Sequence, residues 1–298
     1  MSYKLEKQES LPKTVQRVAI EEIDGSLESM KTMNVHEAVH DVRKRLKKLR
    51  ALARLVRDEM GEKDYKEINI YFRDLGRDLS PIRDLTAHIE TIEALRARYG
   101  DHLYALFFNT VIKEIEKERD EMEAKLKEQE FFSKHVVEKL QKAQKSVKKW
   151  PVKSKDLQVG LPGVERVYKR GYKAMHRSAE SPEDKIYHEW RKRVKYLWYH
   201  YRLLEDLWPG LFSTLQSEVH DLADLLGNDH DLVVLNEKLK SGDLELKENK
   251  QKEVLEALSQ EYSDDLRQRS QALGQLIFAE KPKVFTERIG KYIEMNWD

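Results

Sequence analysis

Apolar residues recur every three or four positions along nearly the whole chain, which is the spacing of amphipathic α-helices. Pro12 suits the first turn of a helix, Asn34 is a candidate N-cap, and Pro81 cannot continue the helix before it. The predicted helices span about 12–33, 35–59, 64–79, 81–98, 101–129, 131–149, 164–180, 182–207, 209–226, 229–241, 245–278 and 281–296. The pattern therefore predicts an all-α fold.

The segment PVKSKDLQVGLPG at 151–163 interrupts this pattern and predicts a boundary between halves 1–150 and 151–298. The halves are alike. HDVRKRLKKL begins at 40 and aligns with HEWRKRVKYL from 188, an offset of 188 − 40 = 148. RDLGRDLSPIRDL begins at 73 and aligns with HDLADLLGNDHDL from 220, an offset of 220 − 73 = 147. Two motifs at nearly one offset predict two tandem, duplicated helical bundles with a pseudo-two-fold relation.

The second predicted helix separates its apolar and basic residues when they are placed at about 100° per residue. Its apolar stripe consists of Val35, Val39, Val42, Leu46, Leu49, Ala53 and Val56. A basic stripe lies about 100° around the helix. It consists of His36, His40, Arg43, Lys47, Arg50 and Arg54. Lys44 falls at the edge of the basic stripe, and we expect Arg45 and Lys48 to face solvent.

The matching helix of the second half repeats this separation. Its apolar stripe is Tyr187, Trp190, Val194, Trp198, Tyr201 and Leu204. Its polar stripe, on the same side, is His188, Lys192, Lys195, Tyr199 and Arg202, with Arg191 at the border. A further basic row follows the same spacing through Arg166, Arg170, Lys173 and Arg177. A pseudo-two-fold relation would make these stripes face one another across a central basic cavity.

Arg83 and His230 extend the basic set, because each precedes an Asp just after a predicted helix stop. Asp84 and Asp231 would then cap the helices that follow. The stretch LGNDHD at 226–231 is predicted to be a loop whose backbone amides can face an anion.

Charge is balanced overall but segregated locally. The 298 residues hold 55 Lys and Arg against 54 Asp and Glu, so a global basic field is absent. Acidic residues gather at 114–130 and 237–265, whereas the stripes carry almost one sign. Because like charges at i, i+4 repel, the stripes favour a bound polyanion over a merely solvated surface.

Several chemistries lack their usual motifs. The chain has no Cys, which excludes disulfides and thiolate sites. A phosphate-binding glycine loop, a zinc-protease helix and a nucleophile elbow are also missing. His36 and His40 have the spacing of a zinc pair, but no third ligand is evident. We expect no metal, no cofactor and no enzymatic activity. Without a secretory signal or a membrane-length apolar run, the chain is expected to be soluble and cytoplasmic.

The repeated pattern H-x-x-R-K-x-x-K-x-L, each time followed by Arg-Asp or His-Asp before an apolar run, resembles the CHAD domain, the conserved histidine α-helical domain. The likeness covers about 12–295, and we expect the domain to stand alone. It implies an all-α protein that binds inorganic polyphosphate in a basic central cavity. Position by position, it implies as site residues His40, Arg43, Lys44, Lys47, Arg50, Arg83, His188, Arg191, Lys192, Lys195, Tyr199 and His230.

One departure concerns the helix break of the first half. The family commonly has Gly near this break, and Ser80-Pro81 stands there in this chain, whereas Gly227 keeps the pattern in the second half. The resemblance at this break therefore rests on the second half alone.

Three functions compete. The leading hypothesis is non-enzymatic binding of inorganic polyphosphate. A phosphohydrolase acting on polyphosphate would need Mg²⁺ near carboxylates such as Asp84 and Asp231. Binding of a nucleic-acid backbone is disfavoured by the near-neutral total charge and by aromatic residues that fall mainly on the apolar stripes. We expect no membrane partner, and homo-oligomers are compatible with the sequence.

Overall fold

The computed structural model describes residues 3–7, 9–100, 105–128, 130–244, 246 and 249–297, and within these ranges it contains helices and no strands. The all-α prediction is confirmed. The helices are α1 (Leu11–Thr32), α2 (Val35–Leu55), α3 (Arg57–Met60), α4 (Glu62–Asp78), α5 (Ser80–Tyr99), α6 (Ala105–Glu128), α7 (Glu130–Val147), η1 (Leu157–Gly160), α8 (Leu161–Glu180), α9 (Asp184–Leu203), η2 (Glu205–Leu207), α10 (Pro209–Ser241), α11 (Asn249–Ile277) and α12 (Pro282–Asn296).

Local sequence signals set most of the helix ends. Pro12 lies in the first turn of α1, and the Asn34 side chain accepts a hydrogen bond of 3.0 Å from the backbone N–H of Glu37 at the start of α2. The predicted helix 35–59 is shorter than expected, because α2 ends at Leu55 and the one-turn α3 follows. Gly61, with a φ of 78°, then separates α3 from α4. The predicted starts at 101 and 245 lie outside the described residues.

The helix break predicted near Gly227 is wrong. Helix α10 runs without interruption from Pro209 to Ser241, so the stretch 226–231 is helical and offers no free loop amides. The corresponding break in the first half is real, since α4 ends at Asp78 and α5 begins at Ser80. A single Gly costs a helix about 1 kcal/mol, which packing can offset, whereas Pro81 removes a backbone donor and forces a boundary.

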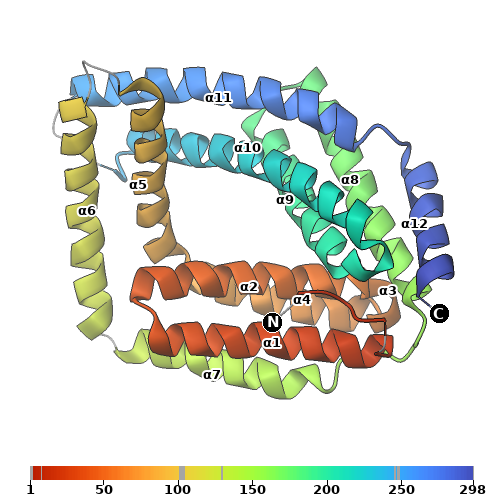
Figure 1. Ribbon diagram of the computed structural model, residues 1–298. Coiled ribbons are helices and arrows are strands. Elements are labelled where there is room, and N and C mark those ends of the chain that lie inside the picture. The colour runs from red at the N-terminus through yellow and green to blue at the C-terminus, as the bar shows by residue number, and fades with distance from the viewer. Residues whose placement is uncertain are drawn as a thin grey trace.

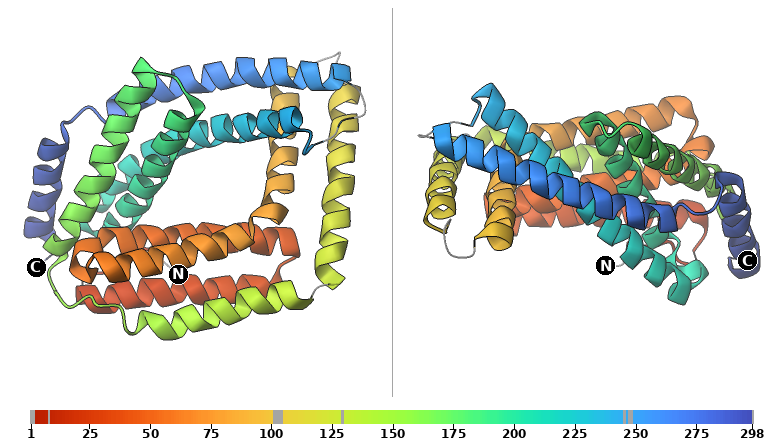
Figure 2. Two further views of the ribbon diagram at one scale, coloured as in Figure 1. Left: turned by 180° about the vertical axis from the view of Figure 1, so that it is seen from behind. Right: turned by 90° about the horizontal axis from the view of Figure 1, so that it is seen from above.

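The helices pair in a repeated order. Helix α1 packs on α2, α2 on α4 and α5 on α6, and in the same order α8 packs on α9, α9 on α10 and α10 on α11. Figures 1 and 2 show α1, α2, α4 and α7 together along one edge, α11 along the opposite edge, and α5 and α6 running between them. The internal duplication itself stays a sequence-based prediction.

Two apolar cores hold the helices together, and each draws residues from both sides of the predicted boundary at 150. The larger core joins α1, α2, α4 and α7 to α8, α9, α12 and the first part of α10. The smaller core joins α5 and α6 to the last part of α10 and to α11. The predicted apolar stripes lie within the larger core, with Trp190 and Leu49 fully buried.

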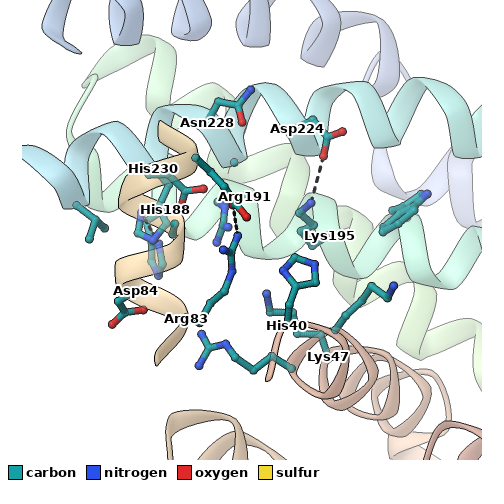
Figure 3. Close-up of a pocket in the computed structure, with 18 of the residues that line it drawn as sticks. His40, Lys47, Arg83, Asp84, His188, Arg191, Lys195, Asp224, Asn228 and His230 are labelled. Atoms are coloured by element: carbon teal, nitrogen blue, oxygen red, sulfur yellow. Dashed lines mark hydrogen bonds and ion pairs between the residues drawn. The ribbon is translucent and has the colours of Figure 1, made fainter. Parts of the chain in front are cut away.

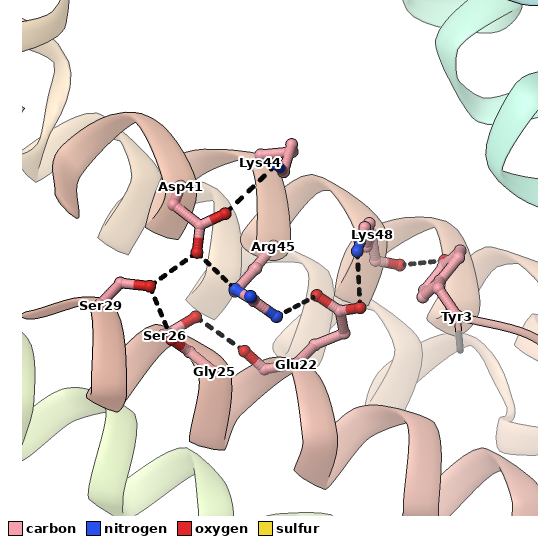
Figure 4. A network of polar contacts seen from close by, with 9 residues as sticks. All are labelled: Tyr3, Glu22, Gly25, Ser26, Ser29, Asp41, Lys44, Arg45 and Lys48. Atoms are coloured by element: carbon pink, nitrogen blue, oxygen red, sulfur yellow. Dashed lines mark hydrogen bonds and ion pairs between the residues drawn. The ribbon is translucent and has the colours of Figure 1, made fainter. Parts of the chain in front are cut away.

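Arg45 and Lys48 do not face solvent as expected, but join a network of ion pairs between α1 and α2 (Figure 4). Lys48 Nζ donates to Glu22 at 2.7 Å, and Arg45 contacts Glu22 at 3.2 Å and Asp41 at 2.6 Å. Glu22 is only 5% exposed, and hydrogen bonds from Arg45 and Ser29 help to lower the pKa of Asp41 to about 2 against the effect of burial. A projection of α2 alone cannot show this, because Glu22 on α1 covers that side of α2.

Gly25 of α1 makes room for this network. A Cβ atom at position 25 would lie 2.3 Å from Nη1 of Arg45, which is closer than real side chains approach. The glycine therefore lets the Arg45 guanidinium lie against the α1 backbone while it pairs with Glu22 and Asp41.

We expect Glu22→Gln to lower the free energy of unfolding by about 2–4 kcal/mol, because it leaves the buried Lys48 amine without its carboxylate. Urea unfolding monitored by circular dichroism measures the change. Glu28→Gln is the matched control, since Glu28 is exposed on the same helix, and its effect should stay within about 0.5 kcal/mol. Equal effects of the two substitutions would contradict a stabilising role for the network.

Candidate functional site: a basic cavity between four helices

Helices α2, α5, α9 and α10 surround a cavity of about 580 Å³ (Figure 3). Its lining combines cations, histidines and carboxylates with a few apolar groups. The lining residues are His40, Arg43, Lys44, Lys47, Arg83, Asp84, Ala87, His88, Glu90, His188, Arg191, Lys195, Trp198, Tyr199, His220, Asp224, Gly227, Asn228, His230, Asp231 and Val234.

Helical spacing explains the contributions of α2 and α9. On each helix the lining residues recur three or four positions apart, so they share one face. Helix α2 supplies His40, Arg43, Lys44 and Lys47. Helix α9 supplies His188, Arg191, Lys195, Trp198 and Tyr199. The structure therefore brings together, at one cavity, residues that lie about 150 positions apart in the sequence.

Helices α5 and α10 complete the lining and bring the carboxylates. Arg83 and Asp84 lie near the start of α5, and Asp84 makes no capping hydrogen bond. His230 and Asp231 lie in the interior of α10, so neither begins a helix. The predicted capping role of both aspartates is wrong, because α10 is continuous and α5 has Leu79 at its N-cap without a side-chain bond.

Two carboxylates of the cavity are engaged in ion pairs. Asp224 contacts Lys195 Nζ at 3.4 Å and His220 Nδ1 at 2.8 Å, and Glu90 contacts Arg83 at 2.5 Å. Asp84 and Asp231 have no ion pair with any described residue. Burial raises the pKa of both carboxyls, while neighbouring arginines oppose the shift.

Three cations of the lining have no carboxylate partner among the described residues: Arg43, Lys47 and Arg191. Arg43 donates from Nη1 only to neutral acceptors, the Gly76 carbonyl at 2.5 Å and the Ser80 hydroxyl at 2.6 Å. Nε of Arg191 is buried and makes no hydrogen bond in the described structure. Such groups carry the full cost of desolvation and of mutual repulsion in the unliganded protein.

Burial, together with the crowding of cations, lowers the affinity of Lys47 and Lys195 for protons. The protein around the Lys47 amine, together with the charges of Arg191, Arg43 and Lys195, lowers the pKa of Lys47 to about 7. Lys47 nevertheless stays open to the water in the cavity. Burial also lowers the pKa of Lys195, although Asp224 partly opposes that shift. The free cavity thus holds lysines that lose their protons more readily than ordinary ones.

Burial lowers the pKa of three histidines that line the cavity, His40, His188 and His230. Burial, Arg191 and His188 lower the pKa of His230 to about 3, and burial and the neighbouring cations also lower the pKa of His188 and His40. Nδ1 of His188 lies 3.3 Å from Nδ1 of His230. Because one of these atoms must accept the hydrogen bond of the other, the two rings are not both protonated.

Seven of the sequence-predicted site residues lie outside this cavity. Nδ1 of His36 is 3.4 Å from the Thr86 hydroxyl, and Lys192 pairs with Glu189. Arg50 bonds Asn69, and Lys173 is exposed on α8. Three further arginines line other depressions. Arg202 lines an open depression that shares Trp198, His220 and Asp224 with the cavity. Arg166 and Arg170 line a separate groove.

Of the lining residues on α5 and α10, only Arg83, Asp84, His230 and Asp231 were predicted from the sequence as neighbours of the site. The full set on α10 recurs at three- and four-residue spacing: His220, Asp224, Gly227, Asn228, His230, Asp231 and Val234. The same projection that revealed the stripe of α2 would have found this face. The predicted break at Gly227 hid it by dividing one helix into two.

Comparison with known families agrees with this architecture. The family model described as CHAD domain matches residues 19–240 of the chain. The match covers most of the chain, and the protein belongs to the CHAD domain family. No curated protein matches the chain. None of the helices in the described ranges combines the length and apolar character needed to cross a membrane.

We expect Lys47 to be acylated by an amine-reactive reagent with a pH midpoint near 7, because the neutral amine is the reactive form. Mass spectrometry of the peptide that contains Lys47 measures the modified fraction at each pH. Arg191→Met should raise the midpoint, since it removes a neighbouring charge that lowers the pKa. Arg96→Met removes an exposed arginine of α5 as a control and should leave the midpoint unchanged. A midpoint above 9 in the unchanged protein would contradict the crowding argument.

Proposed function

We propose that this protein binds inorganic polyphosphate without cleaving it, in the cavity between α2, α5, α9 and α10. The observation that carries the proposal is a set of three cations, Arg43, Lys47 and Arg191, that come from two helices, line one cavity and have no carboxylate partner among the described residues. A polyanion would supply the negative charges that pair with these cations.

Charge arithmetic supports a polyanion over a singly charged ligand. Six Lys and Arg side chains line the cavity against four carboxylates. Two of these carboxylates are engaged with Lys195, His220 and Arg83, so the attraction for phosphate concentrates on the unpaired cations. Arg binds phosphate oxygens through two parallel hydrogen bonds, and Lys acts as a compact point charge.

The size of the cavity also supports the proposal. A volume of about 580 Å³ admits several phosphoryl groups. The cavity continues into the open depression lined by Trp198 and Arg202, so a longer polyphosphate chain can extend beyond the cavity along this depression. Membership of the CHAD domain family supports the same assignment, because this family is known in polyphosphate-related proteins.

The carboxylates favour one second candidate, a phosphohydrolase. Asp84 and Asp231 line the same cavity and make no ion pair with a described residue, so they are the groups that could hold Mg²⁺ beside a phosphate chain. In the described ranges, no three His, Asp or Glu side chains are arranged as a metal site.

We expect Lys47→Glu combined with Lys195→Glu to weaken polyphosphate binding at least a hundredfold, since two attractive charges become repulsive. Isothermal titration calorimetry with long-chain polyphosphate measures the affinity. Lys142→Glu with Lys145→Glu makes the same charge change on exposed positions of α7 and should alter the affinity less than threefold. Circular dichroism checks that both variants fold.

The same titration at two salt concentrations separates the alternatives. Affinity should fall steeply with salt, because each neutralised phosphate releases counterions. Undetectable or salt-insensitive binding would overturn the proposal, and RNA that displaces polyphosphate would favour a nucleic-acid partner. Release of orthophosphate in the presence of Mg²⁺, lost in Asp84→Asn or Asp231→Asn, would establish the phosphohydrolase instead.

We expect polyphosphate binding at pH 8 to take up close to one proton per site through Lys47. Its pKa is about 7 in the free protein, so the amine is mostly neutral at pH 8, and phosphate oxygens favour the charged form. The affinity should therefore fall as the pH rises above 7. Calorimetry in two buffers of different ionisation enthalpy counts the protons. Lys47→Arg keeps the charge without titrating, and its proton uptake should fall correspondingly; unchanged uptake would exclude Lys47 as the source.

A further inference from the structure

A second group of arginines meets at the opposite end of α2 from His40, outside the cavity. Five guanidinium groups, from α2, α3, α8 and α9, line one shallow groove. They belong to Arg54, Arg57, Arg166, Arg170 and Arg193, and Tyr65 and Val167 complete the lining together with Gly163. No residue of this groove lines the cavity.

The fold brings these arginines together through a close helix contact. At Gly163 a Cβ atom would lie 2.3 Å from the Leu55 carbonyl oxygen and 2.5 Å from that of Arg54. The glycine therefore lets the first turn of α8 lie directly on the last turn of α2. Arg166 and Arg170 follow one and two turns later on α8, and this contact carries them toward Arg54 and Arg57.

Carboxylates neutralise only part of the positive charge of the groove. Three of its five arginines have an acidic partner: Arg57 pairs with Glu62, Arg166 with Asp58 and Arg193 with Glu189.

Two arginines remain without a carboxylate. Arg170 makes no hydrogen bond or ion pair with a described residue. In the described part of the chain, Arg54 donates only to the Arg50 carbonyl and to the Asn69 amide oxygen. Nη1 of Arg166 is buried and also without a hydrogen-bond partner among the described residues. The groove thus holds an excess of positive charge and unused donors.

Aromatic rings lie against two of the five guanidinium groups. The Arg54 guanidinium carbon lies 4.1 Å from the ring centroid of Tyr196, and that of Arg57 lies 4.5 Å from the ring centroid of Tyr65. Stacking holds these side chains in one orientation before any ligand arrives, which reduces the entropy lost on binding.

We propose that this groove is a second anion site, which binds one phosphoryl group at the junction of α2, α3, α8 and α9. The groove encloses only about 20 Å³, which is too little to enclose a whole ligand. The ligand is therefore a phosphoryl group that reaches in from solvent. The group belongs either to a polyphosphate chain also held in the cavity or to a separate phosphate ligand. The assignment does not depend on the function of the cavity, since the two sites share no residue.

Tripolyphosphate binding to the variant Lys47→Glu with Lys195→Glu tests the groove with the cavity disabled. We expect this protein to keep one weak site, and Arg170→Gln on this background to weaken that site at least fivefold. Lys169→Gln is the matched control, because Lys169 is the exposed neighbour on α8 and lies outside the groove; it should change the affinity less than twofold. Arg166→Gln provides a second groove variant, and thermal unfolding confirms that each protein folds.

A binding experiment with long-chain polyphosphate and the protein whose cavity is intact identifies the source of the phosphoryl group. If one chain reaches both sites, Arg170→Gln weakens long-chain binding while the stoichiometry stays at one chain per protein. If the ligand is separate, Arg170→Gln removes one of two tripolyphosphate sites and leaves long-chain affinity unchanged.

Equal tripolyphosphate binding by the Arg170→Gln and Lys169→Gln variants, or no residual site in the cavity-disabled protein, would overturn the second site. Loss of long-chain binding on mutation of the cavity lysines tests the cavity alone, so the two proposals fail separately.

Discussion

The cavity depends on the crossing of α2 and α9, where apolar packing holds two rows of like charge close together. At the crossing, Ala51 and Leu197 are fully buried, and Nε2 of His200 lies 3.0 Å from the Ala51 carbonyl oxygen. Burial lowers the pKa of His200 to about 4, so the ring is neutral and donates this hydrogen bond without adding charge. The core on one side of the two helices thus offsets the repulsion between Lys47, Arg191 and their neighbours on the other side.

A protein that holds cations in this way stores unfavourable electrostatic energy that a polyanion would release. The lowered pKa of Lys47 expresses part of that energy, because the amine reduces repulsion by giving up its proton. Arg191 cannot reduce it in the same way at neutral pH, since arginine keeps its charge. Asp224 and Glu90 neutralise Lys195 and Arg83 through ion pairs. The positive charge of the cavity is therefore neutralised in one part and left unpaired in the other. The groove at the end of α2 shows the same division between paired arginines and unpaired ones.

Much of the fold and part of the candidate site could be predicted from local patterns. The apolar stripe of α2, the cap at Asn34 and the break before Pro81 act within one helix or its ends, so neighbouring residues determine them. The predictions that were wrong required knowledge of a neighbour in space. The helical pattern places Arg45 toward solvent, because its partner Glu22 lies on another helix. The continuity of α10 through Gly227 depends on packing that compensates for a weak helix former, and this error hid the polar face with Asp224.

The sequence by itself determined which residues share a helix face, because the helical repeat is set by backbone geometry. It therefore determined the basic stripes and the separation of charge from the core. Only the tertiary structure decided which stripe faces which. It directed His40, Arg43 and Lys47 of α2 toward Arg191 and Lys195 of α9, and it directed Arg166 and Arg170 toward the far end of α2. That choice rests on helix contacts between residues more than a hundred positions apart, such as Gly163 against Leu55, which no local pattern contains.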